Sequence, residues 1–182
     1  MTNDQTRIWQ GEKQAVQALR DGLGRPVDRA IVETVAILRL LGLHTYSSCG
    51  GHAERGCSPY VAFRSPDAST YREQAANEKD EAAARRLRRM TLRANARELA
   101  QLLPLLDRFY SELNFPQSQR LIVQGFGLIG YRLTVQSADL LITNPQWLSP
   151  VMLKRQRDQL NGFTRFLVAE YFAHLKIDTP PE

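Results

Sequence analysis

Apolar residues recur at helical spacing in the first quarter of the chain. A modest amphipathic pattern predicts a short helix over residues 12–23, ended near Gly22 and Gly24. A stronger helix is predicted to begin after Pro26, with Gly42 placed to end it. Its apolar side consists of Val27, Ile31, Val35, Leu38 and Leu41.

Two further helical segments follow later in the chain. Residues 67–113 are rich in Ala, Glu, Arg and Leu, and Pro104 is expected to kink or split this segment, leaving a second piece that ends near Leu113. A long C-terminal helix is predicted to begin at Ser149 and Pro150, an N-cap residue followed by a proline. Its buried side is predicted to hold Met152, Leu153, Leu160, Phe163, Leu167 and Phe172.

Four short segments have the composition or alternation of strands. They cover residues 43–48, 59–63, 120–124 and 131–136, and turn residues separate them. The fold class predicted for residues 1–182 is therefore α+β, as a single domain. Helices, including the long C-terminal one, are expected to pack against a small, mostly antiparallel sheet.

Between the first two predicted strands, the chain gathers most of its thiol and imidazole groups. Of five Cys and His residues, only His174 lies outside the segment that holds His44, Cys49, His52 and Cys57. Thiolate and imidazole are preferred zinc ligands, so these four are the candidate metal ligands, whether all four bind or the last three leave one position open. The alternative is a buried cysteine, an exposed histidine and an incidental second thiol.

The same loop offers groups that can hold an anion. Ser47, Ser48, Gly50 and Gly51 follow a strand and present hydroxyls and main-chain amides, and Arg55 and Arg64 are close in sequence. Such a concave set of donors can bind a phosphate or a carboxylate. Cys49 could instead serve as a nucleophile with His52 as its base, although the sequence identifies no third residue to orient them.

Basic residues are concentrated in one predicted helix. The chain carries a formal net charge of +5, and arginine supplies 20 of its 24 basic residues. One predicted helix concentrates them, with Arg85, Arg89, Arg93 and Arg97 along one side. This stripe predicts contact with the phosphate backbone of a nucleic acid, the alternative being a solvated face.

The segment from His44 to His52 resembles the tRNA wybutosine-synthesis family that methylates the tricyclic guanosine precursor. Ser47, Ser48, Cys49 and Gly51 match that family's signature, and an apolar helix precedes it in the expected place. The resemblance implies tRNA and S-adenosylmethionine as ligands. The same segment also resembles uncharacterised bacterial and phage proteins with Ser-Cys-x-Gly-His, which imply no activity.

A glycine motif occurs farther along. Residues Gly125–Gly130 satisfy GxGxxG, the pattern of dinucleotide-binding loops. The alternation after it, from Tyr131 to Gln136, is that of a strand, whereas the dinucleotide motif requires a helix to begin there. A hairpin turn is therefore predicted, with a dinucleotide-binding enzyme as the alternative.

Composition excludes other classes. No run of about 18 apolar residues exists, which excludes a membrane span. The first residues lack an apolar signal core, and two cysteines cannot build a disulfide framework, so a cytoplasmic protein is expected. Three hypotheses follow: an RNA-binding or RNA-modifying domain, a zinc-stabilised binding module without catalysis, and a dinucleotide-dependent enzyme.

Overall fold

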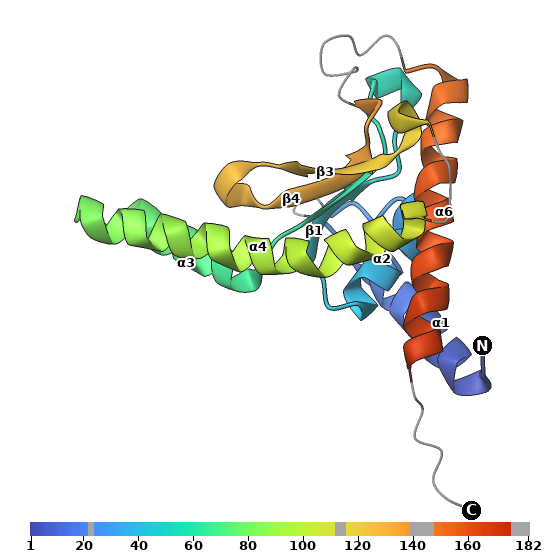
Figure 1. Cartoon of the computed structure of the whole chain (residues 1–182), viewed down its shortest axis with the longest axis horizontal. Coiled ribbons are helices and arrows are strands. Elements are labelled where there is room, and N and C mark those ends of the chain that lie inside the picture. The colour runs from blue at the N-terminus through green and yellow to red at the C-terminus, as the bar shows by residue number, and fades with distance from the viewer. Residues whose placement is uncertain (22–23, 112–115, 139–147, 176–182) are drawn as a thin grey trace, which may run out of the picture.

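Figure 1 shows the computed structural model of the chain, an α+β arrangement in which helices surround a small sheet. The structure describes residues 1–21, 24–111, 116–138 and 148–175. The predicted α+β class, the antiparallel sheet and the long C-terminal helix are all confirmed.

The sheet has four antiparallel strands in the order β1-β2-β4-β3. The strands are β1 (Thr45–Cys49), β2 (Tyr60–Phe63), β3 (Leu121–Gly125) and β4 (Tyr131–Val135). Each lies within two residues of its predicted bounds. Because side chains alternate along β2 and β4, Val61, Phe63 and Leu133 lie on the face of the sheet that packs into the core. Tyr60 and Arg132 lie on the opposite face.

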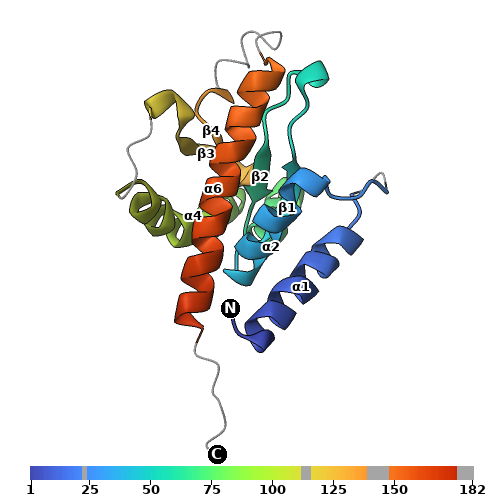
Figure 2. The same ribbon diagram turned by 90° about the vertical axis from the view of Figure 1, so that its right-hand side faces the viewer.

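The main helices are α1 (Asn3–Ala18), α2 (Val32–Leu40), α3 (Pro66–Asn77), α4 (Glu81–Ser111) and α6 (Pro150–His174). Figure 2 shows α6 crossing the molecule with α4 on one side and α1 and α2 on the other. Apolar side chains from α1, α2, α4, α6 and the sheet meet in one core, whose fully buried members include Val16, Ile37, Phe63, Leu102, Phe163 and Leu167.

A helical hairpin projects from this body. Helix α3 lies antiparallel to the N-terminal half of α4, and together they extend away from α6 (Figure 1). The β3-β4 hairpin runs above them, and its turn contacts both helices. One end of α4 therefore belongs to the core, and the other end carries its arginines outward.

The predicted start of the first helix is wrong. Helix α1 begins at Asn3 because Thr2 caps it: the Thr2 hydroxyl accepts a hydrogen bond from the Gln5 amide, and the Gln5 side-chain oxygen accepts one from the Thr2 amide. Trp9 and Val16 are the residues that α1 buries. The helix ends at Ala18, and the predicted end at Leu23 lies outside the described residues.

Of the two outcomes predicted for Pro104, a kink or a split, the split does not occur. The segment divides at residues 78–80, where the Asp80 carboxylate accepts a hydrogen bond from the Ala82 amide and begins α4. Helix α4 then runs through Pro104. Pro104 and Ala100, whose carbonyl loses its intrahelical donor, are both exposed, so water can hydrogen-bond that carbonyl. The predicted end near Leu113 lies outside the described residues.

The glycine motif forms the predicted hairpin. Strand β3 pairs with β4 directly across it, with Gly125 opposite Tyr131. Residues 127–129 make a single 3-10 turn, and no α-helix begins between these two strands. The helix that would direct its amides at a pyrophosphate is therefore missing from this loop.

Candidate functional site

A cleft of about 760 Å³ opens beside β1, between that strand and the segment joining α1 to α2. Its walls include the polar side chains of β1, two aspartates, Asp21 and Asp28, and four arginines, Arg20, Arg25, Arg39 and Arg55. Three of these arginines are engaged: Arg25 pairs with Asp21, Arg39 pairs with Glu12, and Arg20 bonds main-chain carbonyls. The wall is thus polar, and its cations are largely held in place.

In the wall of this cleft, three groups able to bind a metal converge. Asp28, Cys49 and His52 each place one ligand atom within 4.8 Å of the other two. The His52 Nε2 lies 3.2 Å from the Asp28 Oδ2, and the Cys57 Sγ lies 3.7 Å from the Cys49 Sγ. Cys49 ends β1 and His52 opens the next turn, while Asp28 precedes α2.

The loop takes this shape because two glycines are packed tightly within it. Gly51 has φ +81°, and a Cβ there would lie 2.6 Å from the Leu153 side chain. A Cβ on Gly50 would lie 3.2 Å from that of Asp28. Beyond the glycines, His52 and Cys57 exchange two main-chain hydrogen bonds, which close a small loop and bring the two cysteines together.

An arginine of α6 fixes the same loop from behind. The Arg157 Nε donates to the Gly50 carbonyl at 2.8 Å, and its Nη2 donates to the Gly51 carbonyl at 2.7 Å. The planar guanidinium suits two adjacent carbonyl oxygens, so it holds the two peptide groups at a fixed angle. These carbonyls are 107 and 106 residues away in sequence.

The surroundings of the cluster lower the pKa of Asp28 and raise the pKa of Cys49. Burial raises the pKa of Asp28, but the Gly50 amide and the neighbouring His52 and Cys49 stabilise the carboxylate and lower that pKa overall. Burial raises the pKa of Cys49 to about 11, and Cys57 and Asp28 add to the rise. Without a bound cation, Cys49 is therefore a neutral thiol at neutral pH.

This geometry argues against the cysteine nucleophile. The His52 Nε2 faces Asp28, and its Nδ1 lies 3.5 Å from the Glu54 carboxylate. Both ring nitrogens are thus directed at carboxylates, which leaves neither to take a proton from Cys49. The raised pKa of Cys49 also argues against a nucleophilic role, because it keeps the thiol protonated at neutral pH.

The predicted anion-binding amides are already occupied. The Gly50 amide donates to Asp28 at 2.8 Å, and the Gly51 amide donates to the Cys49 sulfur at 3.4 Å. Two predicted binding residues, Ser47 and Ser48, do line the cleft, and the Ser47 hydroxyl hydrogen-bonds that of Tyr60. Arg55 also lines it, whereas Arg64 stacks on the Tyr46 ring at 4.3 Å.

His44 does not join the other predicted metal ligands. It lies before β1 and is bonded to Glu98 of α4, while Asp28 stands beside Cys49 and His52. Sequence reasoning missed Asp28 because it is 21 residues before Cys49 and carries no spacing signal. Only the packing of the α1-α2 connection against β1 brings the two together.

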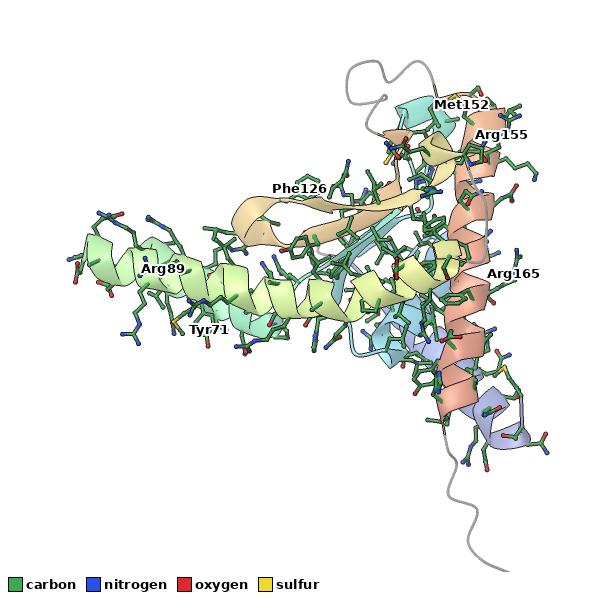
Figure 3. The ribbon with its side chains drawn as sticks, in the orientation of Figure 1. Tyr71, Arg89, Phe126, Met152, Arg155 and Arg165 are labelled. Atoms are coloured by element: carbon green, nitrogen blue, oxygen red, sulfur yellow. The ribbon has the colours of Figure 1, made fainter. Side chains whose placement is uncertain are left out.

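The loop at residues 47–52 and the arginine stripe lie far apart in the structure. Arg89 lies on the projecting hairpin, at the far end of the molecule from Met152 (Figure 3). The loop belongs to the Met152 end, because Arg157 of α6 bonds Gly50 and Gly51 and because Ala53 and Met152 both pack against the cluster of Leu148 and Leu153. Arg85, Arg89, Arg93 and Arg97 thus form a separate surface.

Comparison of the chain with known families, curated proteins and solved structures finds no match in any of the three. None of the described helices combines the length and the apolar character needed to cross a membrane.

Proposed function

We propose that this protein binds RNA, and that the projecting hairpin of α3 and α4 contacts the phosphate backbone. The observation that carries the proposal is a row of four exposed arginines on α4 with no ion-pair partner among the described residues. The row consists of Arg86, Arg89, Arg93 and Arg97, and we call it the arginine row. Arg85 and Arg88 differ, because both pair with Glu81.

The arginine row lies opposite the packed side of its helix. Ala84, Thr91 and Glu98 mark the buried side. At about 100° per residue, the four arginines fall within an arc of about 80° centred opposite those residues. At a rise of about 1.5 Å per residue, the row extends for about 17 Å. Exposed guanidinium groups in such a row can follow successive phosphates.

Aromatic rings next to the hairpin support a single-stranded ligand. Phe126, at the β3-β4 turn, is 40% exposed, and the Arg132 guanidinium lies 4.7 Å from its ring and 4.2 Å from that of Tyr60. The same turn contacts the packed side of α4, opposite the arginine row, since Asn95 donates to the Leu128 carbonyl. An RNA strand that reaches both the ring and the arginine row must therefore pass around the hairpin. An exposed ring beside stacked arginine is a surface on which unpaired bases stack.

Salt dependence of binding tests the proposal. We expect fluorescence anisotropy with a labelled single-stranded RNA to show an affinity that falls as salt rises. Four phosphate contacts predict a log-log slope of about −3. Changing all four residues of the arginine row to glutamine should remove most of that slope. The matched control changes Arg7, Arg29, Arg155 and Arg165 to glutamine, which alters the net charge equally.

The two variants separate a specific surface from general charge attraction. Equal losses in both variants would show that net charge alone carries binding, and salt-independent retention of RNA by the wild type would count against any phosphate contact. A single-stranded DNA and an RNA duplex of the same sequence serve as competitors, and we expect the single-stranded RNA to bind best. Methyl transfer stays a prediction from the wybutosine-family resemblance.

A further inference from the structure

We propose that Asp28, Cys49, His52 and Cys57, which line the cleft, bind a zinc ion separately from the RNA surface. Two thiols, an imidazole and a carboxylate are donors that zinc accepts. They come from two places in the chain: the residue that precedes the turn into α2, and the loop that follows β1. The ion would cross-link these two segments.

The spacing of the donor atoms matches a tetrahedral zinc site along two edges. Sulfurs each about 2.3 Å from a tetrahedral zinc are about 3.8 Å apart, and the Cys49 and Cys57 sulfurs are 3.7 Å apart. Nitrogen and oxygen ligands at about 2.0–2.1 Å give an edge of about 3.3 Å, and the His52 Nε2 and the Asp28 Oδ2 are 3.2 Å apart. Cys49 links the two pairs, because its sulfur also lies within 4.8 Å of the Asp28 and His52 ligand atoms. Cys57 is outside that group of three, so its sulfur must approach Asp28 and His52 when the ion binds.

The groups around the donors are those that support metal ligands. Glu54 lies 3.5 Å from the Nδ1 of His52, on the ring nitrogen that faces away from Asp28. A carboxylate in that position fixes the ring and makes the other nitrogen a better ligand. The Gly51 amide points at the Cys49 sulfur and would stabilise a thiolate there. Arg157 holds the two peptides between Cys49 and His52.

The donor set selects zinc over the common alternatives. Magnesium and calcium prefer oxygen ligands, of which this site offers one side chain. Binding replaces the two thiol protons with metal-sulfur bonds, so each zinc ion bound releases two protons and no oxidant or reductant is required. With four protein ligands the site is closed, which is typical of a structural zinc.

Cobalt(II) substitution is the direct test. Reduced, metal-free protein titrated with cobalt should develop thiolate charge-transfer absorption in the near ultraviolet and strong visible bands, saturating at about one equivalent. Zinc should then displace the cobalt and abolish the bands. Protein purified without chelator should contain about one zinc per chain, as measured by inductively coupled plasma mass spectrometry.

Variants assign the ligands. Cys49→Ser and Cys57→Ser should each weaken the charge-transfer band, and Asp28→Asn should reduce zinc affinity at least about tenfold while keeping an acceptor for the Gly50 amide. His44→Asn and His174→Asn are the matched controls, because neither histidine lies in the cluster. Both should keep the full spectrum.

The outcome is decisive even where a variant fails to fold. Reduced wild-type protein that gives no thiolate band with cobalt overturns the proposal, and so does a band that persists unchanged in folded Cys49→Ser. The fourfold glutamine variant of the arginine row should retain the band. Failure of RNA binding and failure of zinc binding are therefore distinguishable.

Discussion

Glu98 accepts two hydrogen bonds from His44, one from its main-chain amide at 3.0 Å and one involving its Nδ1 at 2.9 Å. Glu98 is only 6% exposed and lies on the packed side of α4. Because His44 immediately precedes β1, this pair ties the start of the sheet to a helix 54 residues away. The bond explains why His44 is turned away from the cysteines.

We expect Glu98→Ala to lower the free energy of unfolding by about 2 kcal/mol, because it leaves the His44 amide without its charged acceptor. The neighbouring Arg97→Ala, on the exposed side of α4, serves as the control and should change stability by less than about 0.5 kcal/mol. Urea denaturation followed by circular dichroism measures both. Indistinguishable midpoints would mean that water replaces Glu98 without cost.

The bidentate contact of Arg157 with the loop should be similarly sensitive. Arg157→Lys keeps the charge but removes the planar fork that reaches both the Gly50 and Gly51 carbonyls. We expect a loss of about 1–3 kcal/mol in the free energy of unfolding, measured by chemical denaturation. Arg155→Lys, on the same helix and exposed, is the matched control. A loss shared equally by both variants would contradict the role given to Arg157.

The fold could be predicted from the sequence where packing follows local periodicity. Alternation placed the strands, and the Ser149–Pro150 pair marked the start of α6, where the Ser149 hydroxyl accepts from the Met152 amide. Two predicted helix boundaries were wrong because a single side chain determines where each helix begins. Thr2 extends α1 through a capping box, and Asp80 rather than Pro104 divides the long helical segment.

The candidate site could be predicted only within its loop. Cys49, His52 and Cys57 are close in sequence, and the turn between them brings them close in space. Tertiary packing places Asp28 in the metal-binding cluster, and the bond to Glu98 keeps His44 out of it. Neither contact has a signature in the local sequence. The arginine stripe was visible in the sequence, but its separation from the loop depends on how the hairpin projects.

Two glycines should respond oppositely to the addition of a methyl group. Gly51→Ala requires a positive φ and places a Cβ 2.6 Å from the Leu153 side chain, so we expect a loss of at least about 2 kcal/mol. Gly11 lies in α1 with open space around its Cβ position, so Gly11→Ala should stabilise the protein by about 0.5–1 kcal/mol. Thermal denaturation of both variants checks the signs. A tolerated alanine at position 51 would show that the loop can shift.

The raised pKa of Cys49 predicts a steep dependence of its reactivity on pH in metal-free protein. Burial is the main cause, and the nearby Cys57 and Asp28 add to it, which brings the pKa from an ordinary 9.0 to about 11. Because only the thiolate is alkylated, the rate at Cys49 should be low at pH 8 and rise about tenfold per pH unit until about pH 11. Mass spectrometry of the peptide that contains Cys49, after timed iodoacetamide treatment with a chelator present, measures this rate.

The raised pKa of Cys49 also determines whether the free energy of unfolding rises or falls with pH. Between pH 9 and pH 11 the unfolded thiol is ionised while the folded thiol keeps its proton. The folded state therefore binds more protons, and its stability should fall as pH rises through that window. Asp28→Asn removes a negative neighbour, so it should lower the pKa of Cys49 and speed alkylation at pH 9, whereas Asp158→Asn, on the exposed side of α6, should not. An alkylation rate that already levels off near pH 9 in the wild type would show that Cys49 is not shielded as the structure indicates.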